Sequence, residues 1–283
     1  MRHIYINKVW KAAASFLPFY FFTFLPLLAL LPLFASCDNI AEGDRYIEVK
    51  QDKPDPQPTP DVIVKNVLLE DFTGQRCSNC PLGTEIVEEL QGVYGDRFVA
   101  VAIHGGPLGF KGTATVMGLA TDLGDEYYNH WSLGYQPIGL IDRGTPTNYP
   151  DWSAAVRKAL DTKATVKMEL QATLNGSNID ISVKETPAAP YSGKLQVWLL
   201  EDGIVGLQTQ PDGSNKRDYV HNHVLRTAVN GHWGQDVTLA TGEQLSQTFT
   251  QAVDAKWDSS KLSVVAFLYN DSGVEQVVKA AVK

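Results

Sequence analysis

The Cys77-Ser78-Asn79-Cys80 motif stands between two segments of different periodicity, and this position constrains the fold more than any other feature. The apolar run at 67–69 predicts a buried strand before the motif. After it, Leu82, Ile86 and Leu90 recur at helical spacing. Unpaired N–H groups at a helix N-terminus favour the thiolate of the first cysteine. The motif therefore predicts a strand–turn–helix unit that can carry thiol chemistry.

The segments downstream of the motif predict a mixed α/β unit. Residues 98–103 form a second apolar run, and a helical crossover before it implies parallel pairing with the first strand. Residues 122–131 and 152–160 have helical character. Pro137 opens a further short strand, where proline is unusual unless it is structural, so Pro137 is a candidate cis peptide.

Beyond Asp161 the apolar pattern changes from helical to alternating. Val166, Met168 and Leu170 begin one such strand, and a turn at 175–178 leads into the next. Further strands are expected at 194–200, 221–229, 244–251, 262–269 and 274–282, the last two joined by a hairpin at Asp271-Ser272-Gly273. Many short strands separated by turns predict an antiparallel β-sandwich of immunoglobulin-like type.

Charge and missing motifs exclude several functions. The chain has 24 Lys and Arg against 32 Asp and Glu, a net charge of −8, so it lacks the basic face that a nucleic-acid partner requires. It carries no Gly-rich phosphate loop, serine nucleophile elbow or HExxH helix. We expect no nucleic-acid partner and no cofactor.

The first 36 residues are typical of a secretory signal. Arg2, Lys8 and Lys11 precede an apolar stretch without acidic residues. Ala35 and Ser36 before Cys37 resemble the lipobox of bacterial lipoproteins, in which Cys37 would be acylated and become the first mature residue. The alternative interpretation is an uncleaved transmembrane anchor, against which the prolines of the stretch argue.

The next segment fits a tether between the membrane and the folded chain. Residues 37–60 are polar and end in alternating prolines, which favour an extended polyproline II spacer. A leader without a structural role is equally consistent with this composition. We therefore predict a signal peptide at 1–36, a lipidated Cys37 with its tether at 37–60, and two folded domains at 61–162 and 163–283.

The segment from Asp61 to Asp161 resembles the thioredoxin superfamily. The resemblance implies that Cys77 is the exposed nucleophile and Cys80 the resolving thiol. It also implies that Asp71 is the buried acid and that Pro137 is the cis-proline facing the sulfurs. Arg76, where many thioredoxins have Trp, and the Ser-Asn pair inside the motif depart from well-known oxidoreductases.

A narrower resemblance covers the folded chain. The segments 67–81, 219–226 and 264–270, behind a lipoprotein signal, resemble the Bacteroidetes 28-kDa outer-membrane lipoprotein family. This resemblance implies an outer-membrane lipoprotein, periplasmic or surface-exposed, with a thioredoxin-like and a β-rich domain. It implies no established reaction.

Two functional hypotheses follow. In the first, Cys77, Cys80, Asp71 and Pro137 perform thiol–disulfide exchange with envelope or extracellular protein partners, while Cys37 holds the chain at the membrane. In the second, the chain is a non-catalytic surface binding protein or adhesin, and Cys77–Cys80 is a fixed structural disulfide. Whether the protein is an enzyme is left open by the sequence.

The C-terminal half contains two further patterns of functional residue types. His221 and His223 would share one face of a strand, but no further ligand stands at a suitable spacing, so we expect no metal site. Tryptophans can form a flat platform that binds carbohydrate, and this half contains Trp198, Trp233 and Trp257. In a β-sandwich, however, such residues more often pack in the core or at its rim.

Overall fold

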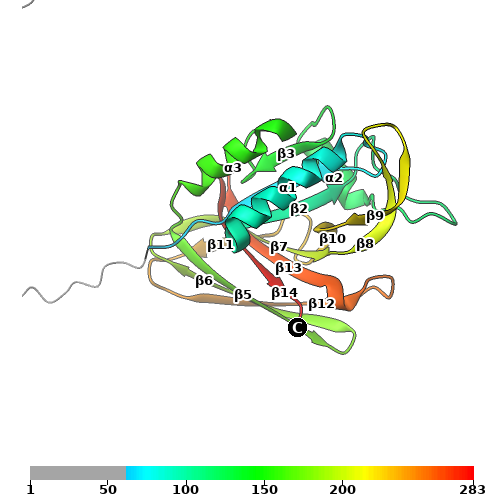
Figure 1. Ribbon diagram of the computed structural model, residues 1–283. Coiled ribbons are helices and arrows are strands. Elements are labelled where there is room, and N and C mark those ends of the chain that lie inside the picture. The colour runs from blue at the N-terminus through cyan, green and yellow to red at the C-terminus, as the bar shows by residue number, and fades with distance from the viewer. Residues whose placement is uncertain (1–61) are drawn as a thin grey trace, which may run out of the picture. The chain divides into compact units, whose positions relative to one another are not determined.

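Two parallel strands, β1 (Val67–Thr73) and β2 (Phe98–His104), lie at the centre of the molecule. The computed structural model describes residues 62–283, which are coloured by chain position in Figure 1. Every residue of β1 is buried, as expected for an apolar run with both faces covered. The predicted parallel pairing is confirmed.

One nine-stranded sheet extends from these strands in the order β14-β13-β7-β10-β2-β1-β3-β4, with β11 paired to β7. Its other members are β3 (Ile138–Ile141), β4 (Thr147–Asn148), β7 (Tyr191–Glu201), β10 (Val224–Ala228), β11 (Gln235–Leu239), β13 (Leu262–Asn270) and β14 (Gly273–Ala281). Strand β10 lies between β2 and β7, parallel to the first and antiparallel to the second. Strands on both sides of the predicted boundary at 162/163 thus share one sheet, and the boundary itself stays a prediction.

A three-stranded sheet forms a second layer, below the large sheet in the view of Figure 1. It consists of β12 (Leu245–Ala252), β6 (Asn178–Pro187) and β5 (Val166–Asn175). Ile179 and Val183 of β6 share a core with Leu195 and Val264 of the large sheet. The alternation of buried and exposed residues along β6 confirms the predicted periodicity. The β-rich fold is confirmed, while an immunoglobulin-like topology stays a prediction.

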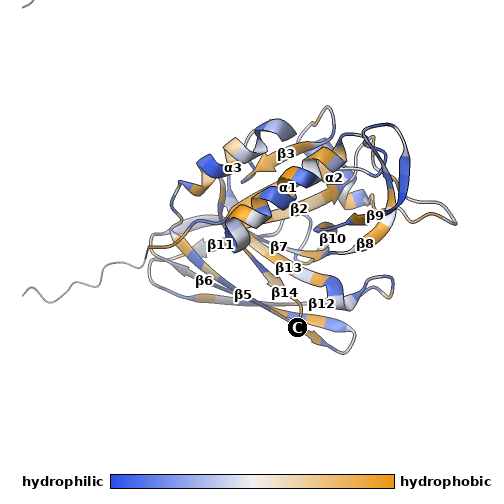
Figure 2. Ribbon diagram, in the orientation of Figure 1, coloured by the Kyte–Doolittle hydropathy of each residue, from blue (hydrophilic) through white to orange (hydrophobic). Residues whose placement is uncertain are grey.

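Three α-helices pack on the large sheet at the predicted places. They are α1 (Cys80–Tyr94), α2 (Asp122–His130) and α3 (Trp152–Leu160). Val87 of α1 and Trp152 of α3 share one core with β1 and β2, whereas Tyr127 of α2 belongs to another. Figure 2 shows hydrophilic and hydrophobic colours alternating along α1, as its one-sided burial requires.

A separate hairpin of β8 (Ile204–Thr209) and β9 (Asn215–His221) was not predicted. The strand expected at 221–229 is wrong as one element, because β9 ends at His221 and β10 begins at Val224. Between them His223 has a φ of 58°, and its N–H donates to Asp202 Oδ1 at 2.6 Å. This turn means that His221 and His223 do not share one strand face.

The predicted signal peptide at 1–36, the acylated Cys37 and the tether at 37–60 lie outside the described residues. From residue 62 onward, no helix combines the length and apolar character needed to cross a bilayer.

Candidate functional site

Cys77 and Cys80 form a disulfide at the N-terminal end of α1, with a Cα–Cα distance of 5.4 Å. The N–H of Cys77 donates to the Gly74 carbonyl at 3.0 Å, which closes the turn after β1. Pro81 follows in the first turn of α1, where a helix needs no N–H from it. The predicted arrangement of strand, motif and helix is therefore confirmed.

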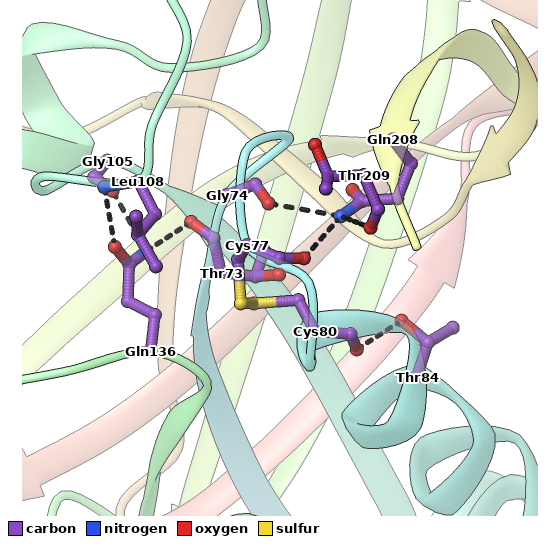
Figure 3. Close-up of a disulfide and its surroundings, with 10 residues drawn as sticks. All are labelled: Thr73, Gly74, Cys77, Cys80, Thr84, Gly105, Leu108, Gln136, Gln208 and Thr209. Atoms are coloured by element: carbon purple, nitrogen blue, oxygen red, sulfur yellow. Dashed lines mark hydrogen bonds between the residues drawn. A yellow bond between two sulfur atoms is a disulfide. The ribbon is translucent and has the colours of Figure 1, made fainter. Parts of the chain in front are cut away.

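The exposure implied for Cys77 is wrong. Its exposed fraction is 1%, and that of Cys80 is 2%. The resemblance to thioredoxins concerned residues 61–161 alone, but residues beyond 200 cover this site. The β8–β9 hairpin lies against the loop that carries the motif, as the hydrogen bonds from Gln208 to Gly74 and Cys77 in Figure 3 show.

Gln208 of β8 holds the hairpin to the disulfide loop. Its Nε2 donates to the Cys77 carbonyl at 2.8 Å and to the Gly74 carbonyl at 3.3 Å (Figure 3). The side chain is buried, so both carbonyls receive a donor where water has little access. A buried carbonyl without a donor is destabilising by about 1–3 kcal/mol. Gln208 therefore stabilises the covered state of the disulfide.

Gln75 makes the same connection from the motif side. Its carbonyl accepts the N–H of Thr209 at 2.9 Å, and its Nε2 donates to the Leu207 carbonyl at 3.0 Å. Its Oε1 accepts the N–H of Leu119 at 2.8 Å. Gln75 is fully buried, so every polar atom of its amide is used within the protein. Neither Gln75 nor Gln208 carried a sequence signal that marks it as part of the site.

Pro137 follows a cis peptide bond, as predicted. The preceding Gln136 donates from Nε2 to the carbonyls of Thr73, at 2.6 Å, and Gly105, at 3.0 Å. Its Oε1 accepts the N–H of Leu108 at 3.0 Å (Figure 3). These bonds tie the loop of Pro137 to the end of β1. The structure thus brings the proline segment and the cysteine pair to the same end of the sheet.

Asp71 lies on β1, and burial raises the pKa of its carboxyl to about 7. Its Oδ1 has no hydrogen-bond partner among the described residues. Asp71, Cys80, His104, Tyr219 and His221 line a small cavity of about 30 Å³, enough for one or two water molecules. A carboxyl with this pKa can give or take a proton near neutral pH. The predicted buried acid is therefore near the disulfide, on the side of Cys80.

Two buried histidines line the same cavity. The rings of His104 and His221 stand 5.3 Å apart, and His221 Nε2 lies 3.3 Å from the Leu207 carbonyl. Burial lowers the pKa of His221 to about 4. Burial, His221 and Arg226 lower the pKa of His104 well below its usual range. His104 was not singled out by sequence, although it ends a parallel strand, where sites often form.

The remaining candidate groups are the histidines and tryptophans of the C-terminal half. Within residues 62–283, no three His, Cys, Asp or Glu side chains are placed to hold a metal ion. Trp198 is fully buried in the core that contains Tyr127, and Trp233 packs partly buried against it. Trp257 packs on a different core. These three tryptophans therefore form no common platform.

The family model of outer membrane protein Omp28 matches residues 124–283. The chain belongs to this family. Membership confirms the predicted outer-membrane lipoprotein location. The match begins after Cys80, so it does not bear on the cysteine pair.

The chain is similar to two solved structures at low identity. HBP35 of Porphyromonas gingivalis matches with a TM-score of 0.63 and 15% identity, over 78% of this chain and 76% of that protein. This likeness shows a shared fold alone. A domain of the outer membrane lipoprotein Omp28 from the same organism matches with 27% identity and a TM-score of 0.31, over 42% of this chain and 89% of that domain. A comparison with curated proteins gave no match.

Proposed function

We propose that this protein is a non-catalytic binding lipoprotein of the outer membrane, in which Cys77–Cys80 is a structural disulfide. The burial of both cysteines beneath the β8–β9 hairpin is the observation that supports it. Thiol–disulfide exchange needs a thiolate to reach a sulfur atom, and reactive cysteines are accessible. Here a thiolate can reach the sulfur atoms only after two contacts break: that of Gln208 with the motif loop and that of Gln75 with the hairpin.

The reduction potential of the Cys77–Cys80 pair tests this proposal. We expect a value below about −300 mV, the range of structural disulfides. The full-length chain, purified in detergent, is equilibrated with thiol redox buffers and the free thiols are counted. A potential between about −270 and −120 mV, the range of working oxidoreductases, would contradict the proposal.

The second candidate function is thiol–disulfide exchange with envelope proteins, and Asp71 is the observation that favours it. A buried acid with a pKa of about 7 has no structural partner at Oδ1 within the described residues and lies beside Cys80. In this mechanism a dithiol donor first reduces the Cys77–Cys80 disulfide. The Cys77 thiolate then attacks a substrate disulfide, forms a mixed disulfide and releases the first substrate thiolate. Cys80 loses a proton to Asp71 and attacks the Cys77 sulfur, which breaks the mixed disulfide and releases the second substrate thiolate, so the substrate is reduced and the cysteine pair oxidised.

This second candidate treats residues 61–162 as a thioredoxin-like domain. Its support is the parallel β1–β2 pair with the crossover helix α1, the antiparallel β3 and the cis peptide at Pro137. An immunoglobulin-like domain at 163–283 has weaker support, because β7 and β10 continue the sheet of β2.

Insulin reduction separates the two candidates. Exchange predicts that the full-length protein with a dithiol reductant precipitates insulin, and that Cys77→Ser abolishes this activity. A structural disulfide predicts no activity above that of the reductant alone. Gln208→Ala removes the contact between the hairpin and the disulfide loop. It should raise the rate of insulin reduction only if access to the disulfide limits that rate.

Attachment to the membrane through an acylated Cys37 is also a proposal. Its support is the lipobox-like sequence together with the confirmed family. Several acyl chains on one residue provide stable anchoring. Cys37→Ser should release the protein from the membrane fraction into the soluble fraction. Protease treatment of intact cells then tests surface exposure, since complete protection excludes an adhesin.

A further inference from the structure

A groove separate from the disulfide lies where the end of α2 meets β7, β11 and the turn after β13. Its volume is about 850 Å³, and it shares no lining residue with the cavity at Asp71. Small-molecule sites commonly measure about 300–1,000 Å³. Neither cysteine and none of the groups discussed for exchange takes part in it, so its role is independent of redox chemistry.

One side of the groove is aromatic. His130, Trp131, Trp233 and Tyr269 line it. The His130 ring lies 4.2 Å from the Trp233 ring and 5.0 Å from the Trp131 ring, measured between centroids. His130 is exposed and the other three are half-buried, so their rings are in part available to a ligand. Such rings offer flat apolar faces with polar edges.

Hydrogen bonds hold this aromatic side in place. Trp233 Nε1 donates to Glu126 Oε1 at 2.9 Å, and the Trp233 carbonyl accepts the Tyr269 hydroxyl at 2.7 Å. Beneath Tyr269, the guanidinium carbon of Arg143 lies 3.9 Å from the ring centroid. These contacts fix two of the rings before any ligand arrives, which reduces the entropy cost of binding.

The other lining residues of the groove include several polar ones. Among them are Ser192, Lys194, Asp236, Asn270 and Asp271. Lys194 Nζ is 2.7 Å from Asp236 Oδ1, so these two charges neutralise each other. Arg143 is paired with Glu70 at 3.4 Å, so Asp271 is the one lining charge without an ion-pair partner among the described residues. A single carboxylate disfavours an anionic ligand, whereas hydroxyl, amide and carboxylate groups suit a ligand with many hydrogen-bonding groups.

Some N–H groups at the groove lack acceptors. Trp131 Nε1 and both terminal nitrogens of Arg143 have no hydrogen-bond partner among the described residues. Buried donors of this kind normally find a partner. In the structure these N–H groups are shielded from solvent, so they are not a preformed contact for a ligand. They indicate that hydrogen-bond acceptors are missing near the aromatic side.

We infer that this groove binds a neutral saccharide. A sugar ring has an apolar C–H face that packs on an aromatic ring and a rim of hydroxyls that donate and accept hydrogen bonds. The groove offers the aromatic side for the first and Asp271 for the second. Asn270 and Lys194 already bond to Ser192, Ser272 and Asp236, but an amide and an ammonium group keep capacity for further hydrogen bonds. The inference rests on the proposed binding function and names its ligand class.

Titration of the full-length protein in detergent tests this inference. The probes are the neutral tetrasaccharides of glucose, mannose, galactose and N-acetylglucosamine, followed by tryptophan fluorescence and calorimetry. We expect one of them to bind at a single site. His130→Ala and Asp271→Ala, which change exposed side chains, should each raise Kd about tenfold. The control Tyr135→Ala removes an exposed ring outside the groove and should leave Kd unchanged within about twofold.

Three results would overturn the inference. One is that none of the four sugars binds at about 10 mM, a concentration that detects even millimolar affinity. Another is binding that neither His130→Ala nor Asp271→Ala weakens. The third is a peptide mixture that occupies the groove in preference to every sugar. None of these changes the reduction potential of Cys77–Cys80, so the proposed structural role of the disulfide stands or falls separately.

Discussion

At the scale of single residues, the buried carboxyl of Asp71 makes stability depend on pH. Burial raises its pKa from 3.8 to about 7. Between pH 3.8 and about 7, the Asp71 carboxyl is deprotonated in the unfolded chain but still protonated in the folded chain. The free energy of unfolding therefore falls as pH rises from about 4 to about 7, and this contribution is constant above that range.

Asp71→Asn should remove this dependence, because the amide has no charge to bury. We expect the variant to match the wild type near pH 4 and to be more stable at pH 8 by a few kcal/mol, at about 1.4 kcal/mol per unit of pKa shift. Urea denaturation across this pH range measures the difference. Asp96→Asn, at an exposed position, is the control. Parallel pH profiles for wild type and Asp71→Asn would contradict the assignment.

Gln208 is the second residue whose role is local and testable. Gln208→Ala leaves the carbonyls of Cys77 and Gly74 without their side-chain donor. We expect a loss of about 1–3 kcal/mol in stability and a severalfold faster reduction of the disulfide by a water-soluble phosphine. Gln171→Ala, on the exposed face of β5, should change neither quantity. An unchanged reduction rate in Gln208→Ala would show that the hairpin does not limit access.

At the scale of elements, the β8–β9 hairpin decides whether the disulfide is accessible. Its inward side chains include Gln208 and His221, while Val205 and Val220, paired across the strands, are 58% and 47% exposed. The inner side holds a neutral imidazole, because burial lowers the pKa of His221 from 6.5 to about 4. Opening of the hairpin would return the pKa of His221 toward 6.5. Between pH 4 and 6.5, opening is therefore accompanied by protonation of His221.

Acid should therefore loosen the hairpin. As pH falls from about 6.5 toward 4, the stabilisation from neutral His221 is lost, and the lowered pKa of buried His104 acts in the same direction. Asp71 lines the same cavity, and its raised pKa acts in the opposite direction, but two histidines titrate against this one carboxyl. We expect phosphine reduction of the disulfide, relative to that of an exposed small-molecule disulfide at the same pH, to be faster at pH 4.5 than at pH 7. His221→Gln, which cannot be protonated, should show a smaller acceleration. Equal acceleration in both proteins would assign the effect to other groups.

At the scale of the whole molecule, one sheet joins segments that are far apart in sequence. The pairing of Val224 with Ala102 and of Leu225 with Leu200 inserts β10 between β2 and β7. Lys65 adds to this connection, since its Nζ donates to the Val274 carbonyl and is 3.1 Å from Asp142 Oδ2. The two sides of the sheet thus depend on each other for backbone pairing.

Cooperative unfolding is the expected consequence. We predict a single thermal transition for the folded chain, with equal calorimetric and van't Hoff enthalpies. A fragment of residues 61–162 should lack a cooperative transition, because β2 loses its neighbour β10. Differential scanning calorimetry measures both. Two separate transitions in the intact chain would instead favour independent domains at 61–162 and 163–283.

Local patterns predicted much of this structure. The apolar runs of β1 and β2, the helical spacing after Cys80 and the turn at Asp271-Ser272-Gly273 each depend on neighbouring residues, and each element formed where expected. The hairpin was missed because β9 reads Asn-Lys-Arg-Asp-Tyr-Val-His, without the alternation that marks a half-buried strand. Its order comes from contacts with the motif loop, which no local pattern encodes.

The sequence by itself determined that a cysteine pair stands at a helix start and made the proline after it a candidate cis peptide, while the buried acid before the pair was implied by the resemblance to thioredoxins. Only the tertiary structure decided that the pair is covered. The covering residue, Gln208, lies 131 positions after Cys77. Access to a sulfur atom depends on what packs against it, and such packing is a property of distant segments rather than of the motif.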